Sequence, residues 1–255
     1  MSSWGLLLFV VLSCGYGNKP ENCIVADAMT TLRQDLPIQL AGIGKVREID
    51  YEGKSVIFQM KIKEDDTYGV NIGKINEKVR LAKQIVSAQI GMMTDKQKNA
   101  MRDIAEQSFG LKVIINGTNS NRGEIELLPE EIKSSLVNAA NRTPDDFSLE
   151  MIALTTKIML PVQVDQVTIW SDTQMTESAF VYVYKLKDYD IDISRIDLNM
   201  FKKEKTDILR QNMDVMGNVV RLCKSTHRNL VYRYIGNSSN KSIDVVITPS
   251  DLGKI

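Results

Sequence analysis

The chain repeats one pattern of residues, and this repeat restricts its fold more than any other feature. At an offset of 124 residues, SVIFQMKIKEDD from Ser55 aligns with AFVYVYKLKDYD from Ala179. Further on, GLKVIINGTNSNRGEIELLPEEI from Gly110 aligns with NLVYRYIGNSSNKSIDVVITPSDL from Asn229, at an offset of 119 that becomes 120 after one extra residue. Self-similarity over this length indicates two copies of one structural unit. We therefore expect two superimposable domains.

The aligned strands also keep the same alternation of side chains. The apolar positions of the first copy coincide with those of the second: Val56, Phe58, Met60 and Ile62 with Phe180, Tyr182, Tyr184 and Leu186. Because successive side chains of a strand point to opposite faces of its sheet, matching phase places the same face inward in both copies.

Each copy reads as two strands, a helical stretch and two more strands. In the first copy the helical stripe comprises Ile72, Ile75, Val79, Ala82, Val86 and Met93. Gly91 and Thr94 predict a break and a new N-cap before a second helix that ends near Phe109. Glycine and asparagine at 116–121 and 236–240 predict hairpin turns. The expected fold is α+β: two tandem ββ-α(α)-ββ domains, each a four-stranded antiparallel sheet with helices on one face.

Composition limits the class of protein. The 255 residues include 32 Lys plus Arg and 32 Asp plus Glu, so no overall field favours nucleic acid. The cysteines Cys14, Cys23 and Cys223 match no zinc spacing. Cys223 follows a core stripe and has the apolar Ile104 as its counterpart, which predicts a buried thiol that is not bonded to Cys23.

The N-terminus has the pattern of an export signal. An apolar run, WGLLLFVVL, is too short to span a bilayer and is followed by Ser13-Cys14-Gly15. Val11-Leu12-Ser13-Cys14 resembles the lipobox of bacterial lipoproteins, a resemblance confined to these residues. It implies lipidation of Cys14 and a lipid-anchored location in the cell envelope, facing the periplasm or the outside. Ordinary secretion and an N-terminal anchor or buried strand are the alternatives.

These observations divide the chain into five parts. We expect a signal peptide at 1–13, a tether at 14–25, the first α+β repeat at 26–132, a linker at 133–148 and the second repeat at 149–255. A helix around 26–33 and another leading into Leu160-Pro161 are counterparts.

Residues with catalytic or metal-binding potential are isolated. His227 is the only histidine, and its counterpart is Ser108, so we interpret it as a solvated loop residue. No GxSxG, HExxH or P-loop motif is present. Asp188, Asp190 and Asp192 imitate the start of a calcium loop, but the glycine and glutamate that such a loop needs are missing, which leaves only a weak cation site open. We predict no enzyme, cofactor or metal.

Two clusters in the second copy have competing interpretations. The tyrosines at 182, 184, 232 and 234 would suit a ligand groove, but their aliphatic counterparts favour a core face. Lys202, Lys203 and Lys205 are interpreted as a solvated helix face. On the outward phase Val183 replaces Gln59, so Val181 and Val183, together with Trp170, are candidates for contact with the first domain or a protein partner.

The function that follows is a non-enzymatic envelope lipoprotein that acts as a protein-binding or assembly module. Its membrane contact is the lipid on Cys14, its partner is an envelope protein, and neither nucleic acid nor a small-molecule ligand is expected. The alternatives are an inhibitor or immunity-type lipoprotein that blocks an envelope enzyme, and a carboxylate-based hydrolase, which would need two converging carboxylates.

Overall fold

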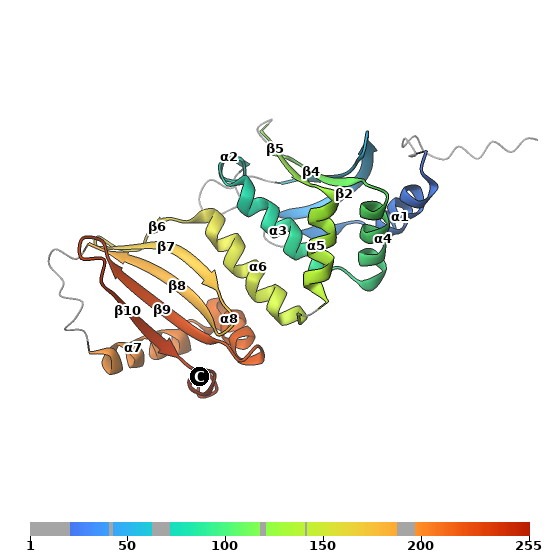
Figure 1. Ribbon diagram of the computed structural model, residues 1–255. Coiled ribbons are helices and arrows are strands. Elements are labelled where there is room, and N and C mark those ends of the chain that lie inside the picture. Colours follow the sequence, from blue (N-terminus) through green and yellow to red (C-terminus); the bar gives the residue numbers. More distant parts are fainter. Residues whose placement is uncertain (1–20, 41–42, 63–71, 118–120, 141, 188–196) are drawn as a thin grey trace, which may run out of the picture.

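The computed structural model describes residues 21–40, 43–62, 72–117, 121–140, 142–187 and 197–255 (Figure 1). These ranges form two domains of mixed α and β structure, each built around one sheet. The predicted signal peptide, Cys14 and Asp188, Asp190 and Asp192 lie outside the described residues.

The first domain contains a sheet with strand order β1-β2-β3-β4-β5. Its elements are, in chain order, α1 (Cys23–Arg33), β1 (Ile38–Leu40), β2 (Gly44–Glu52), β3 (Ser55–Lys61), α2 (Ile72–Glu77), α3 (Val79–Met92), α4 (Asp95–Glu106), β4 (Gly110–Asn116), β5 (Arg122–Leu127) and α5 (Pro129–Ala139). Strands β3 and β4 are parallel, and the other neighbours are antiparallel.

The second domain has the same strand order in its sheet, β6-β7-β8-β9-β10. Its elements are α6 (Pro144–Met159), β6 (Val162–Gln163), β7 (Thr168–Met175), β8 (Ala179–Leu186), α7 (Leu198–Gln211), α8 (Met213–Ser225), β9 (Asn229–Gly236), β10 (Ser242–Ile247) and α9 (Pro249–Leu252). Here β8 and β9 are the parallel pair.

The registers of the two sheets match at the offsets found in the sequence. The parallel pairs begin at Ser55 beside Gly110 and at Ala179 beside Asn229. An irregularity in the register of β2 between Val46 and Glu48 recurs in β7 between Trp170 and Asp172, 124 residues later. The two domains therefore agree in topology and in local detail.

The prediction of four antiparallel strands was wrong in two respects. The segment expected to be one first strand forms two, because a turn that ends at Ile43 separates β1 from β2. In the second domain Asp165 closes the equivalent turn, and its carboxylate accepts hydrogen bonds from the backbone N–H groups of Val167 and Thr168. The helical stretch returns the chain to the starting end of the sheet, which makes the middle pair parallel.

Several local predictions were confirmed. Thr94 caps α4 in a capping box with Gln97. The hairpin of the first domain closes with the N–H of Gly117 donating to the carbonyl oxygen of Asn121.

Two helical segments differ from the prediction. The predicted helical stripe of residues 72–93 is interrupted at Lys78, which separates α2 from α3. The stretch 133–148, expected to be a linker, is largely helical, since α5 continues to Ala139 and α6 starts at Pro144.

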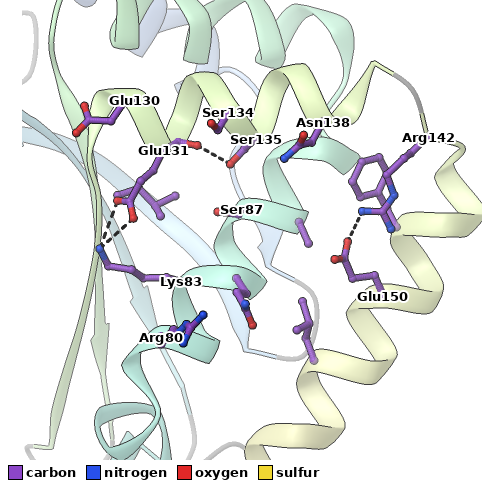
Figure 2. Close-up of a pocket in the computed structure, with 15 residues that line it drawn as sticks. Arg80, Lys83, Ser87, Glu130, Glu131, Ser134, Ser135, Asn138, Arg142 and Glu150 are labelled. Atoms are coloured by element: carbon purple, nitrogen blue, oxygen red, sulfur yellow. Dashed lines mark hydrogen bonds and ion pairs between the residues drawn. The ribbon is translucent and has the colours of Figure 1, made fainter. Parts of the chain in front are cut away.

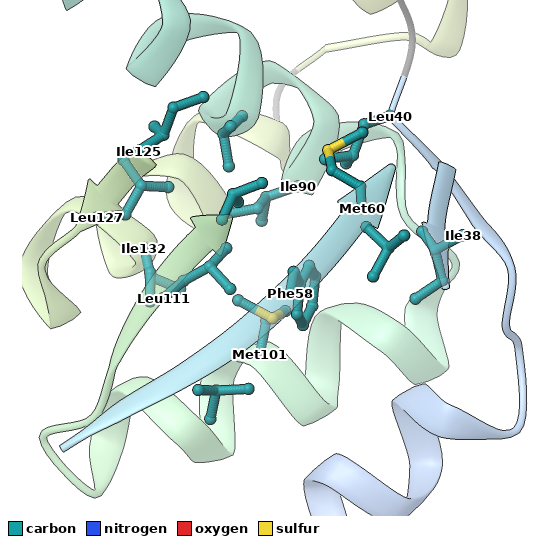
Figure 3. Close-up of a cluster of buried hydrophobic side chains, with 14 of the residues drawn as sticks. Ile38, Leu40, Phe58, Met60, Ile90, Met101, Leu111, Ile125, Leu127 and Ile132 are labelled. Carbon is teal, nitrogen blue, oxygen red and sulfur yellow. The ribbon is translucent and has the colours of Figure 1, made fainter. Parts of the chain in front are cut away.

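The first core lies between the sheet and the helices that cover one of its faces (Figure 3). Phe58 and Met60 extend from β3, while Met101 and Ile132 reach the same cluster from α4 and α5. The opposite face of the sheet is polar, with an ion pair of 2.9 Å between Lys112 and Glu124 across β4 and β5.

Helix α6 belongs to both cores. Met151, Leu154 and Ile158 pack in the first core. Leu149, Ile152 and Ala153, on another side of the helix, pack in the second core. Figure 1 shows this helix between the two sheets. Because one helix contributes to both clusters, the domains are joined by shared apolar burial as well as by the chain.

Both ends of α6 are fixed against α3. Near its start, Phe147 lies against Gly91, where a Cβ atom would approach the ring to 2.4 Å. Beyond its end, the Lys78 ammonium donates hydrogen bonds of 2.9, 3.0 and 2.6 Å to the carbonyl oxygens of Lys157, Ile158 and Leu160. A cation at this position satisfies carbonyl groups that the helix leaves free and complements the helix dipole.

The replacement Gly91→Ala should lower the free energy of unfolding by about 1–3 kcal/mol, because the added methyl group displaces the Phe147 ring. Gly217→Ala in α8 is the matched control. A Cβ atom there meets Met213 at an ordinary 3.5 Å, so we expect a gain of up to about 1 kcal/mol from helix propensity. Urea denaturation measures both. Equal stabilisation by the two replacements would contradict the close packing of α3 on α6.

Candidate functional site

The face of the second sheet opposite its helices carries an apolar cluster that we call the valine face. It consists of Ala179, Val181, Val183, Val231 and Ile235, of which the first four are 4–8% exposed. All of these residues belong to β8 and β9, and no helix residue joins this cluster in the part of the chain that the structure describes. Val181 and Val183, which the sequence predicted to lie together on this face, do so.

One transverse row of residues shows how the valine face differs from the first sheet. In the first domain, Asp50, Ile57, Lys112 and Glu126 lie side by side across four strands. In the second, the same row reads Gln174, Val181, Val231 and Val246. Three charged positions have become uncharged, and two of them are valines. Val246, on the edge strand β10, is 37% exposed.

A polar pair, Arg233 and Asp244, interrupts the valine face, since Arg233 lies between Val231 and Ile235 on β9. Arg233 binds Asp244 through two hydrogen bonds of 2.8 and 2.7 Å, and both lie in the same row as Val183. At the other end of the row the carboxylate of Asp172 accepts a hydrogen bond from the Gln174 side chain. It also forms an ion pair with Lys157 of α6. Protein contact surfaces usually combine apolar residues with polar groups.

Trp170 does not belong to the valine face, contrary to the grouping proposed from the sequence. It lies in the row of Tyr184 and Tyr234, on the face that packs against the helices. Its ring is 5.4 Å from that of Tyr182 in an edge arrangement, and its indole N–H donates to the carbonyl oxygen of Asp172.

The four tyrosines continue this aromatic layer. Tyr182 stacks on Tyr232 at 5.5 Å, and Tyr184 stacks on Tyr234 at 5.2 Å. Burial raises the pKa of Tyr184 to about 12. Three of the rings are buried and Tyr184 is half-buried, so the face is mainly a core face, as the sequence favoured.

His227 has a backbone role that sequence reasoning did not identify. It follows α8 with a φ of 55°, and Ser108 follows α4 with a φ of 62°. At each of these two positions, the backbone N–H of the following residue donates a hydrogen bond to a carbonyl oxygen of the helix. Arg228 donates to Cys223 in the second domain, and Phe109 donates to Ile104 in the first. Both residues therefore end a helix in the left-handed conformation. The signal was their alignment at offset 119, combined with the helix ends.

The remaining predicted residues are separated in space or already paired. Cys223 is a buried free thiol that is not bonded to Cys23, as predicted, and burial raises the pKa of Cys223 to about 12. Cys23 is free and exposed. Lys202 pairs with Asp251 at 2.7 Å, and this bond holds the pKa of Asp251 well below its usual value. No group of three metal-ligating side chains occurs among the described residues.

A groove of about 550 Å³ lies between α3, α5 and α6 (Figure 2). Two of its three carboxylates are paired with cations, Glu131 with Lys83 at 3.3 Å and Glu150 with Arg142 at 2.7 Å. The guanidinium of Arg142 also covers the ring of Phe147 at 4.5 Å. The Lys83–Glu131 pair joins α3 to α5, and Arg142 connects the segment before α6 to that helix, so the geometry supports a structural role for these pairs.

Comparison of the chain with protein-family models, curated proteins and solved structures found no match. In the ranges that the structure describes, no helix has the length and apolar character needed to cross a membrane.

The left-handed conformation at His227 generates a stability prediction. His227→Gly should raise the free energy of unfolding by about 0.5–1 kcal/mol, because glycine adopts positive φ without the cost that a side chain imposes. Arg228→Gly, one residue further on, is the control and should destabilise, since Arg228 bonds Asp146 at 2.5 Å. Loss of stability in His227→Gly would show that the imidazole makes interactions beyond this turn.

Proposed function

We propose that the protein is a non-enzymatic lipoprotein of a bacterial cell envelope that binds another envelope protein through the valine face. The observation that carries the proposal is the divergence of the two open sheet faces, one charged and one apolar, on domains that otherwise agree in register. A sheet face that only meets water has no need of adjacent valines on neighbouring strands.

The partner expected at the valine face is a protein with an apolar contact surface and polar groups around it. Val181, Val183 and Val231 supply the apolar centre, and the Arg233–Asp244 pair supplies polar groups beside it. The first domain is held by α6 and does not contribute to this cluster. Val181, Val183 and Val231 are only 4–6% exposed, whereas Val246 is 37% exposed, so a partner would reach this face through Val246 and the Arg233–Asp244 pair.

Anchoring is the second part of the proposal. The lipobox-like segment Val11-Leu12-Ser13-Cys14 would place a lipid on Cys14, ahead of the Gly- and Asn-rich stretch 15–22. A tethered, two-domain body with an apolar sheet face suits a module that holds a partner near the membrane.

The binding proposal is tested by crosslinking in the native envelope. A photoreactive amino acid in place of Gln174, which lies in one row with Val181 and Val231, should give a crosslinked product. Val183→Lys should reduce that product by at least about tenfold, because a charge would enter the apolar contact. Gln59→Lys, at the corresponding position of the first sheet, is the matched control and should leave it unchanged.

Val246→Glu provides a second variant, since Val246 is exposed and Glu126 occupies its position in the first domain. It should also reduce the crosslink. A product that survives both Val183→Lys and Val246→Glu would refute binding through this face. A product of twice the mass of the chain would identify the partner as a second copy.

Lipidation is tested independently in cells. Labelling with a palmitate analogue should mark the parent protein, and Cys14→Ala should abolish the label, because the thiol of Cys14 is the expected acceptor. Cys23→Ala is the matched control and should retain the label. Equal labelling of the parent protein and Cys14→Ala would contradict the lipobox interpretation.

A further inference from the structure

The second domain has a pocket at one end of its core, on the face opposite the valine face. It has a volume of about 350 Å³ and lies between α7, the β6–β7 turn and the ends of β8 and β9. We call it the Lys205 pocket. Its walls include Thr168, Tyr184, Leu186, Phe201 and Tyr234, and two charged residues, Lys205 and Asp165.

The same place is closed in the first domain. The counterparts of Thr168, Tyr184 and Leu186 are Gly44, Met60 and Ile62, at the offset of 124. These three residues pack so tightly that a Cβ atom on Gly44 would lie 2.9 Å from Ile62 and 3.0 Å from Met60. Replacement of the glycine and the methionine by larger residues changes this end of the core.

A second replacement accompanies weaker burial of the helix that covers the sheet. In the first domain Gly123 of β5 lets α2 approach, and Ile72 lies 3.4 Å from where its Cβ atom would be. Ile72 and Ile75 are fully buried as a result. In β10 the corresponding residue is Ile243, beside Tyr234. The bulkier row leaves the covering helix α7 with Leu209 as its one buried residue.

The rim of the pocket shows the same divergence. Val164 and Val167 of the β6–β7 turn are 54% and 40% exposed. Their counterparts, Leu40 and Ile43, are 1% and 6% exposed. Pockets that bind small molecules are lined predominantly by apolar side chains, and this rim supplies them.

Lys205 gives the pocket a cation. Its ammonium lies 5.1 Å from the ring centre of Phe201, 5.9 Å from that of Tyr232 and 5.7 Å from that of Tyr234. No carboxylate lies within ion-pair distance of it in the described ranges of the chain, although Lys202 of the same helix has such a partner. Burial lowers the pKa of Lys205, opposed by the charges of Glu204 and Asp165.

We propose that the Lys205 pocket binds a small apolar carboxylate, whose hydrocarbon part packs against Tyr184, Phe201 and Tyr234 and whose carboxylate pairs with Lys205. The pocket has room for roughly a dozen non-hydrogen atoms. Within the described residues Glu204 and Asp165 act on this partly desolvated ammonium only from beyond ion-pair distance, so a ligand carboxylate would be its direct partner, and charge-assisted bonds are strongest in such surroundings. The site lies on the other face of the sheet from the valine face and does not depend on the function proposed for that face.

Octanoate is a suitable probe, and Trp170 is a suitable reporter, since its ring lies 6.3 Å from Tyr184 in the pocket wall. In the full chain carrying Trp4→Phe, Trp170 is the only tryptophan. Octanoate should cause a saturable change in its fluorescence. Lys205→Met, which keeps the apolar stem, should weaken binding at least tenfold, and Lys203→Met on the exposed side of the same helix should leave it unchanged.

Lys205→Arg keeps the positive charge and should bind octanoate with an affinity within about threefold of the parent chain. If Lys205→Met is unstable in thermal unfolding, Lys205→Gln takes its place. Three results would overturn the proposal: no saturable response of the parent chain to millimolar octanoate, equal affinity after the charge at 205 is removed, or preference for octyltrimethylammonium over octanoate.

Discussion

The structure depends on the burial of helix α6 from two sides. Met151, Leu154 and Ile158 recur at helical spacing and enter the first core, while Leu149 and Ala153 enter the second. A helix with two apolar stripes is stable only when both are covered. The contact of Phe147 with Gly91 and the hydrogen bonds from Lys78 fix the helix at its two ends. Each domain therefore completes part of the other's packing.

With the domains joined in this way, divergence is concentrated in surfaces that α6 does not need. The first sheet has a charged open face and a closed core, whereas the second has the valine face and the Lys205 pocket. The residues responsible occupy corresponding positions of the two sheets: Lys112 of the first corresponds to Val231 of the second, and Gly123 corresponds to Ile243. The first domain thus provides an internal reference for what this fold requires, and the second shows what has been added.

Much of the fold could be predicted from the sequence, because strand alternation and the two offsets are local signals. The split between β1 and β2 could not, since apolar residues such as Leu40, Ile43 and Val46 occur on both sides of the turn and suit a single strand. The position of Trp170 was missed because the register shift between Trp170 and Asp172 reverses the alternation along β7. The double role of α6 was present in the spacing of Met151, Leu154 and Ile158, but periodicity alone does not say which core a stripe enters. The Lys205 pocket was missed because it depends on how α7 packs on the sheet, which is a tertiary effect.

The joint burial of α6 implies that the two domains unfold as one unit, and hydrogen exchange measures this directly. Peptides from β4 and β9, the parallel strands at the centre of each sheet, should exchange through a single global opening with the same free energy and the same dependence on urea. The account predicts that the two curves coincide. If β9 exchanged at a lower urea concentration while β4 stayed protected, the domains would be independent and the shared helix would not couple them.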